Sequence, residues 1–173
     1  ILSASRFLGL FMNSATGKFR QRYATYAPVN DKEDLRLPGD ITAELKKSID
    51  LINNTTEGLK FYVVDSHTDL EMYYGLTGYK HPNYYIFLRK DAMSPEANRD
   101  LIKRLQDYPY ILINQKDYFS FITDKDAYEK WERSIDANLM SYITENYAIL
   151  ASYKRPEEVK DIWLADFFIM KRK

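Results

Sequence analysis

The stretch LKFYVVDSHTDLEMYYGLTG, residues 59–78, decides the fold of this chain. Its first part, LKFYVVD, is a short apolar run with β-branched and aromatic side chains, which predicts a buried strand. The part that follows predicts a short helix, capped by Ser66 or Thr68 and ended by Gly75 or Gly78. A buried strand that leads directly into a helix is a building unit of α/β sheets.

Helical and strand patterns alternate along the rest of the chain. The other predicted elements are, in chain order, a helix at 40–56, a strand at 83–88, a helix at 94–108, a strand at 109–114, one long helix at 124–147, and strands at 148–153 and 161–172. The helix at 94–108 opens with Ser94 as its cap and Pro95 at its first position. This order predicts an α/β fold, a three-layer α/β/α sandwich with a mixed, mostly parallel sheet and a C-terminal antiparallel hairpin.

The length of 173 residues suits one compact domain, which we expect to span residues 39–173. Residues 1–38 show no clean periodicity, and we interpret them as an N-terminal arm or a linker that follows a membrane segment. The polar segment at 27–40 is predicted to be a loop, because Pro28 and Pro38 punctuate it.

Composition excludes several classes of function. The 25 basic and 25 acidic side chains balance, which argues against a nucleic-acid partner. The chain has no cysteine, so disulfides, thiolate metal sites and cysteine nucleophiles are excluded. The motifs GxGxxG, GxxxxGK[ST], GxSxG and HExxH are also absent. We therefore predict neither a cofactor nor a metal, and no catalytic residue in this chain.

The segment after the first strand carries the candidate site. Asp65, His67 and Asp69 follow that strand, and the carboxyl ends of parallel strands are where α/β sheets usually bind ligands. The three side chains could form a metal or acid–base cluster. We favour a capped turn with a hydrogen-bonded histidine, because no fourth metal ligand is evident.

Aromatic side chains crowd the same segment. Its tyrosines could stack on a sugar or a lipid head group, or they could pack in the core, and the sequence supports both readings equally. The substrate-binding candidates are Asp65, His67, Asp69, Tyr73, Tyr74, Tyr79, His81 and Tyr85.

The spacing of residues 67–88 resembles a known family. The residues that carry the pattern are His67, Asp69, Leu70, Tyr73, Leu76, Thr77, Gly78, Pro82, Tyr85, Phe87 and Leu88. They resemble the C-terminal soluble region of bacterial polytopic glycosyltransferases that use a polyprenyl-phosphate sugar donor, such as protein O-mannosyltransferases and aminoarabinose transferases. The likeness covers residues 36–173 through the order and spacing of several segments. It departs from the family at Tyr79, where an arginine is common.

The resemblance implies a role outside the bilayer. In that family the catalytic acid lies between the first membrane helices, so this chain would be a non-catalytic cap on the extracytoplasmic face of the bacterial cytoplasmic membrane. Its partners would be the membrane helices of the same parent chain and a glycan or lipid-linked sugar. Two alternatives stay open: a stand-alone α/β interaction module or accessory subunit, and a small hydrolase or transferase that uses Asp65, His67 and Asp69.

Overall fold

β3 (Phe61–Val64) is buried along its whole length, as its apolar sequence predicts. Its side chains alternate between the two faces of a sheet. Phe61 and Val63 belong to one hydrophobic core, and Tyr62 and Val64 belong to a second core. A strand that is buried on both faces requires a layer of helices on each side.

The computed structural model describes residues 26–30, 33–67, 69–79, 82, 88–159 and 164–173. The strand predicted at 83–88 lies outside the described residues except for Leu88. Side chains are described from Ile41 onward, so the first strands are known here by their backbone alone.

The central sheet has the strand order β3-β4-β6-β5. β3 and β4 (Tyr110–Asn114) run parallel, whereas β6 (Phe167–Arg172) pairs antiparallel with both β4 and β5 (Tyr147–Tyr153). These pairings confirm the mixed α/β sheet and the C-terminal hairpin. The parallel part is a single pair of strands, and the hairpin partner β6 is inserted beside β4 rather than added at the outer edge.

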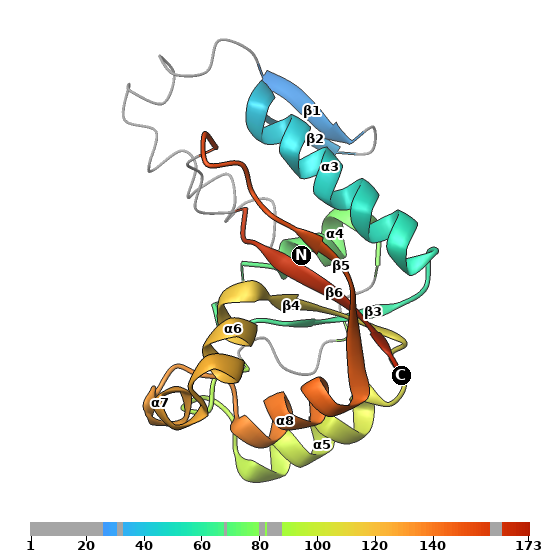
Figure 1. Ribbon diagram of the computed structural model, residues 1–173. Coiled ribbons are helices and arrows are strands. Elements are labelled where there is room, and N and C mark those ends of the chain that lie inside the picture. The colour runs from blue at the N-terminus through green and yellow to red at the C-terminus, as the bar shows by residue number, and fades with distance from the viewer. Residues whose placement is uncertain (1–25, 31–32, 68, 80–81, 83–87, 160–163) are drawn as a thin grey trace.

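Helices cover both faces of the sheet (Figure 1). α3 (Gly39–Thr56) and α4 (Met72–Thr77) pack on the face that contains Phe61. α5 (Pro95–Leu105) and α8 (Ala137–Asn146) pack on the opposite face. The three-layer arrangement is therefore confirmed. Each helix within the described ranges is too short or too polar to span a lipid bilayer.

Tyrosine hydroxyls connect the layer of α3 and α4 to the sheet. The Tyr74 hydroxyl accepts a hydrogen bond of 2.7 Å from the backbone N–H of Val63, and the Tyr73 hydroxyl donates to Ser48 on α3. β3 is an edge strand, and edge strands leave backbone groups without a strand partner. Tyr74 thus satisfies one such donor while its ring stacks on Phe61 at 5.3 Å.

The short helix α4 differs from its prediction at its start. Glu71 occupies the N-cap position and its side chain makes no capping hydrogen bond, so Ser66 is not the cap that the sequence predicts. Ser66 is engaged elsewhere, and Thr68 lies outside the described residues. The end of the helix agrees with the sequence, because Gly78 closes it with a left-handed φ of 77°. The predicted cap Ser94 of α5 is also confirmed, since it accepts from the N–H of Ala97.

The loop predicted at 27–40 is wrong. β1 (Tyr26–Asn30) and β2 (Glu33–Pro38) form a separate antiparallel pair that lies beside α3. Pro28 lies within β1 and Pro38 ends β2. In a two-stranded ladder each strand has one side without a partner strand. A proline whose missing N–H would point to that side costs no ladder hydrogen bond, so prolines are compatible with this pair of strands.

The single long helix predicted at 124–147 is also wrong. α7 (Lys125–Lys130) ends at Trp131, and α8 starts anew at the N-cap Asp136, whose side chain accepts from two backbone N–H groups. Between them Ile135 is fully buried and forms an isolated bridge with Arg89. The apolar spacing of this segment fits a helix. The free energy gained by burying the Ile135 side chain in the core nevertheless exceeds what continuation of the helix would contribute.

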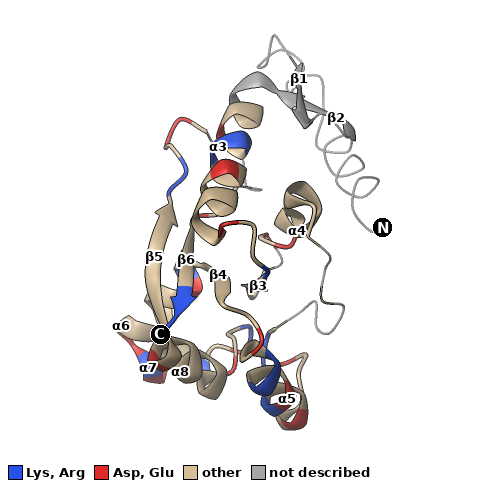
Figure 2. Cartoon of the chain, turned by 90° about the vertical axis from the view of Figure 1, so that its right-hand side faces the viewer, with Lys and Arg blue, Asp and Glu red and all other residues tan. Residues whose placement is uncertain are grey.

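The surface charge is mixed, as the neutral sequence predicts. Figure 2 shows acidic and basic residues side by side on α5, where Arg99 pairs with Glu96 at 2.9 Å and Arg104 with Asp100 at 2.6 Å. Exposed pairs of this kind contribute little stability, so their main effect is to break up single-sign charge on this helix.

Candidate functional site

The turn after β3 is organised by the buried carboxylate of Asp65. It accepts hydrogen bonds from the N–H groups of His67 at 2.9 Å and Leu70 at 2.8 Å. The side-chain amide of Asn114, at the end of the parallel neighbour β4, lies at 3.4 Å. The carboxylate therefore replaces the strand partners that the chain loses when it leaves the sheet.

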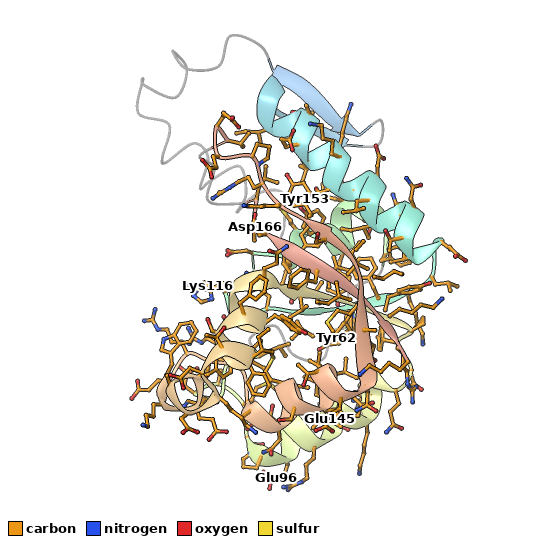
Figure 3. All side chains as sticks on the ribbon, in the orientation of Figure 1. Tyr62, Glu96, Lys116, Glu145, Tyr153 and Asp166 are labelled. Atoms are coloured by element: carbon orange, nitrogen blue, oxygen red, sulfur yellow. The ribbon has the colours of Figure 1, made fainter. Side chains whose placement is uncertain are left out.

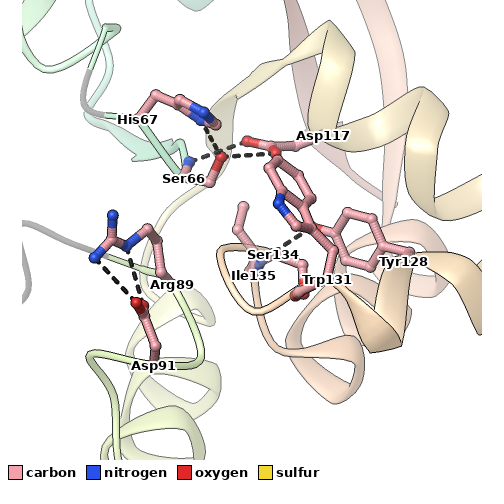
Figure 4. Close-up of polar contacts among 9 residues, drawn as sticks. All are labelled: Ser66, His67, Arg89, Asp91, Asp117, Tyr128, Trp131, Ser134 and Ile135. Carbon is pink, nitrogen blue, oxygen red and sulfur yellow. Dashed lines mark hydrogen bonds and ion pairs between the residues drawn. The ribbon is translucent and has the colours of Figure 1, made fainter.

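A second buried carboxylate, Asp117, reaches the same turn from α6 (Gln115–Thr123). It accepts from the N–H of Ser66 at 3.0 Å and from the Ser66 hydroxyl at 2.8 Å. The Ser66 oxygen is also 2.5 Å from Nδ1 of His67, as Figure 4 shows. The carboxyl ends of β3 and β4 are thus joined by the chain His67–Ser66–Asp117.

Asp65, His67 and Asp117 each bring one potential ligand atom to within 4.8 Å of the others. Carboxylate oxygens and imidazole nitrogen are suitable ligands for several divalent metals. The donors around these atoms weigh against a metal, because Ser66, His67 and Leu70 already donate to the two carboxylates. We interpret the cluster first as a hydrogen-bonded βα turn, which agrees with the reading favoured by the sequence.

Burial and mutual repulsion change the acid–base properties of the carboxyl groups. Burial raises the pKa of Asp69 to about 6, and the charge of Asp65 adds to this effect. Burial and Asp65 also raise the pKa of Glu71 to about 8. Burial raises the pKa of Asp117, although the two hydrogen bonds from Ser66 oppose that rise. The polar edge, by which we mean the surface where β3 and β4 end, therefore holds carboxyl groups that exchange protons near neutral pH.

Trp131 supplies an aromatic surface beside this polar edge. Its ring centroid lies 5.9 Å from that of His67, and the Nζ atom of Lys116 lies 5.6 Å from its centre. Lys116 is exposed at the start of α6 (Figure 3), and its charge lowers the pKa of Asp69. An exposed imidazole, an ammonium group and a half-buried indole therefore meet at one place on the surface.

The sequence-predicted residues separate into two groups. Asp65, His67 and Asp69 share the edge described above. Tyr73 and Tyr74 are core residues with 0% and 3% exposure, so they offer no ring face to a ligand in this structure. Tyr79 is half-buried with its ring edge-on to Phe61 at 4.9 Å. His81 and Tyr85 lie outside the described residues.

Three residues of the polar edge are not among the candidates that the sequence pattern gives, namely Lys116, Asp117 and Trp131. The apolar spacing of residues 116–131 fits strand and helix faces, so the sequence pattern alone indicates a structural role for this segment. A usable signal was present: Asp117 lies just after β4, as Asp65 lies just after β3. The carboxyl ends of two adjacent parallel strands meet at one edge, which would have brought these residues together.

Comparison with protein-family models, with curated proteins and with solved structures finds no match to this chain. The geometry of the site is therefore the basis for a functional proposal, together with the resemblance described from the sequence.

Proposed function

We propose that this chain is a non-catalytic recognition domain of a membrane glycosyltransferase that uses a polyprenyl-phosphate sugar. In this role it contacts the acceptor or the sugar of the donor on the extracytoplasmic side. The spacing of residues 67–88 and the order of the segments over 36–173 suggest the family. The observation that carries the proposal is the surface made by His67, Lys116 and Trp131.

The chemistry of that surface suits a sugar. The apolar C–H face of a sugar ring packs on an indole, and its hydroxyl groups need donors and acceptors in fixed positions. His67 and Lys116 supply donors next to Trp131, and Asp69 supplies an acceptor. The hydrogen bonds through Ser66 fix the turn that carries His67, which lowers the entropy lost on binding.

A recognition role fits the cluster better than nucleophilic catalysis does. Ser66 is the hydroxyl nearest to His67, but its side chain is buried and its proton is donated to Asp117. A serine nucleophile has to give its proton to a base and face the substrate. The polar chain below the surface therefore positions His67 rather than activating Ser66.

The experiment is sugar transfer by the protein encoded by the complete reading frame. We expect His67→Ala and Lys116→Ala each to lower kcat/KM by about tenfold or more, mainly through KM, since one lost hydrogen bond to a charged partner is worth about 1.5–3 kcal/mol. Lys103→Ala is the matched control, because Lys103 is exposed on α5, a helix that contributes no residue to this surface. Unchanged transfer in both edge variants would contradict the proposal.

One observation favours a second function, that of a metal-dependent or acid–base enzyme. Asp65, His67 and Asp117 approach one another within 4.8 Å, and Asp69 has a pKa of about 6 beside them. This function predicts that the chain binds Zn²⁺ or Mn²⁺ with loss of affinity in His67→Ala, and that it hydrolyses a substrate by itself. Calorimetric titration with each metal separates the two functions, because a recognition domain needs neither property.

The third alternative, a stand-alone interaction module, is separated from the first by the reading frame. A glycosyltransferase cap requires many apolar helices encoded upstream of Ile1, whereas a stand-alone module requires none.

A further inference from the structure

A pocket of about 320 Å³ opens between α6 and α7, on the surface next to the polar edge. It is lined by Ser120, Thr123, Asp124, Ala127, Tyr128 and Trp131. Its volume is at the low end of small-molecule sites, which span about 300–1,000 Å³. Trp131 belongs both to this pocket and to the surface that His67 and Lys116 flank, so the two places share one side chain.

The aromatic part of the lining is held in place by its neighbours. The Tyr128 ring meets Trp131 edge-on at 6.4 Å and Phe121 edge-on at 5.5 Å. The Tyr128 hydroxyl accepts a hydrogen bond of 3.0 Å from the N–H of the buried Ile135. These contacts fix an apolar wall before any ligand arrives, so little conformational entropy remains to be lost on binding.

The polar part of the lining consists of oxygen atoms. Oδ1 of Asp124 accepts from the N–H of Ala127 and caps α7, and this cap does not use Oδ2. Ser120 and Thr123 add hydroxyl groups from the last turns of α6. The pocket therefore combines an aromatic wall with one anionic acceptor and two groups that both donate and accept.

We infer that this pocket is a subsite for a single neutral pyranose ring, with the C–H face of the ring on Trp131 and its hydroxyl groups on Ser120, Thr123 and Asp124. The inference rests on the proposed function for the general role, and it adds a second contact place and the chemical class of its occupant. A sugar ring offers both an apolar C–H face for Trp131 and hydroxyl groups for Ser120, Thr123 and Asp124, whereas a purely apolar ligand offers only the first.

Trp131 also provides the reporter for the test. The chain has two tryptophans, Trp131 and Trp163, so Trp163→Phe leaves Trp131 as the only indole. Titration of this protein with methyl glycosides of common pyranoses should change its fluorescence with a dissociation constant in the millimolar range. Bound glycoside should also protect Trp131 from quenching by iodide. Inorganic phosphate should give neither effect.

Asp124→Asn tests the polar contact without removing the helix cap, because asparagine is as good an N-cap as aspartate. In the Trp163→Phe background we expect it to weaken glycoside binding about tenfold, as loss of a charged hydrogen-bond acceptor does. Asp107→Asn, an exposed aspartate after α5, is the matched control and should leave the affinity unchanged. Unchanged far-ultraviolet circular dichroism verifies the fold of both variants.

The outcomes separate this inference from the proposed function. No fluorescence response to any glycoside, or an equal response in Asp124→Asn, overturns the pyranose subsite. The proposed function still stands in that case if His67→Ala and Lys116→Ala lower sugar transfer. A glycoside response that depends on Asp124, together with unchanged transfer in the two edge variants, supports the subsite and contradicts the role given to the edge.

Discussion

Glu71 carries a carboxyl group whose pKa burial and Asp65 raise to about 8. This value lies above the ordinary 4.5, so the folded state holds the proton more tightly than the unfolded chain does. The stability that this group contributes is fully present below about pH 4.5, and it is lost as the pH rises through about 8.

We expect Glu71→Gln to remove that part of the pH dependence. Glutamine stays neutral, so the variant should gain roughly 1–3 kcal/mol relative to the original protein between pH 5 and pH 9. Urea unfolding at unit steps of pH measures the difference. Glu145→Gln, at an exposed position near the end of α8, is the control. Parallel pH profiles for the original protein and Glu71→Gln would refute the expectation.

The pair formed by Ser66 and Asp117 predicts coupled effects on stability. Ser66→Ala removes the hydroxyl donor, and Asp117→Asn places an amide group against one of the two donors of Ser66. Each change should cost about 1–3 kcal/mol. The double variant should cost less than the sum by about 1 kcal/mol, because both changes remove the same bond. A double-mutant cycle by urea unfolding measures the coupling, and strict additivity would argue against it.

At the scale of elements, α4 offers two glycines with opposite requirements. Gly78 ends the helix at a φ of 77°, whereas Gly75 lies within it, and a Cβ atom at either position meets nothing within 4 Å. Gly75→Ala should therefore stabilise the protein by about 0.5–1 kcal/mol through helix propensity. Gly78→Ala should destabilise it by about 1–2 kcal/mol through the left-handed backbone. Thermal unfolding should give midpoints on opposite sides of the original value.

Asp136 decides where α8 begins. Its carboxylate accepts from the N–H groups of Asn138 and Leu139, so Asp136→Ala should cost about 1 kcal/mol. Asp107→Ala, at an exposed position outside the helices, should change the stability by much less. Equal unfolding midpoints for the two variants would show that the cap does not determine the start of α8.

The elements show which parts of the fold the sequence predicts. Strands such as β3 and β4 are recognisable because both of their faces are apolar, and the start of α5 is marked by Ser94 and Pro95. The break between α7 and α8 is not predictable by periodicity, because Ile135 fits a helical face yet lies between the helices, where its backbone bridges to Arg89 and its side chain packs in the core. Only tertiary structure contains that information.

The sequence predicts only the part of the candidate site whose residues are close together in the chain. Asp65, His67 and Asp69 are close in sequence, so one turn brings them together and a local pattern reveals them. Asp117 lies 51 residues after Ser66, and its position depends on the parallel register of β3 and β4. Whether Tyr73 and Tyr74 pack in the core or contact a ligand depends on their packing against α3. A tyrosine-rich segment does not by itself contain that information.

For the whole molecule, the two cores share one sheet, so we expect them to unfold together. Leu45→Ala affects the core under α3, and Leu139→Ala affects the core under α8. Each should cost about 2–5 kcal/mol, because both side chains are almost fully buried. Fluorescence and circular dichroism should report one coincident urea transition in each variant. Separate transitions in either one would show that the two layers are independent.

The position of β6 has a consequence for how the chain folds during synthesis. β6 is made after every other strand described here, yet it lies between β4 and β5 in the sheet. A ribosome-bound chain that has not been translated past Arg172 can pair β3 with β4 but exposes the other side of β4. Such an edge invites pairing with another nascent chain. The described sheet thus depends on β6 to join β4 to β5, and premature termination before Phe167 should yield an aggregating product instead of a smaller stable domain.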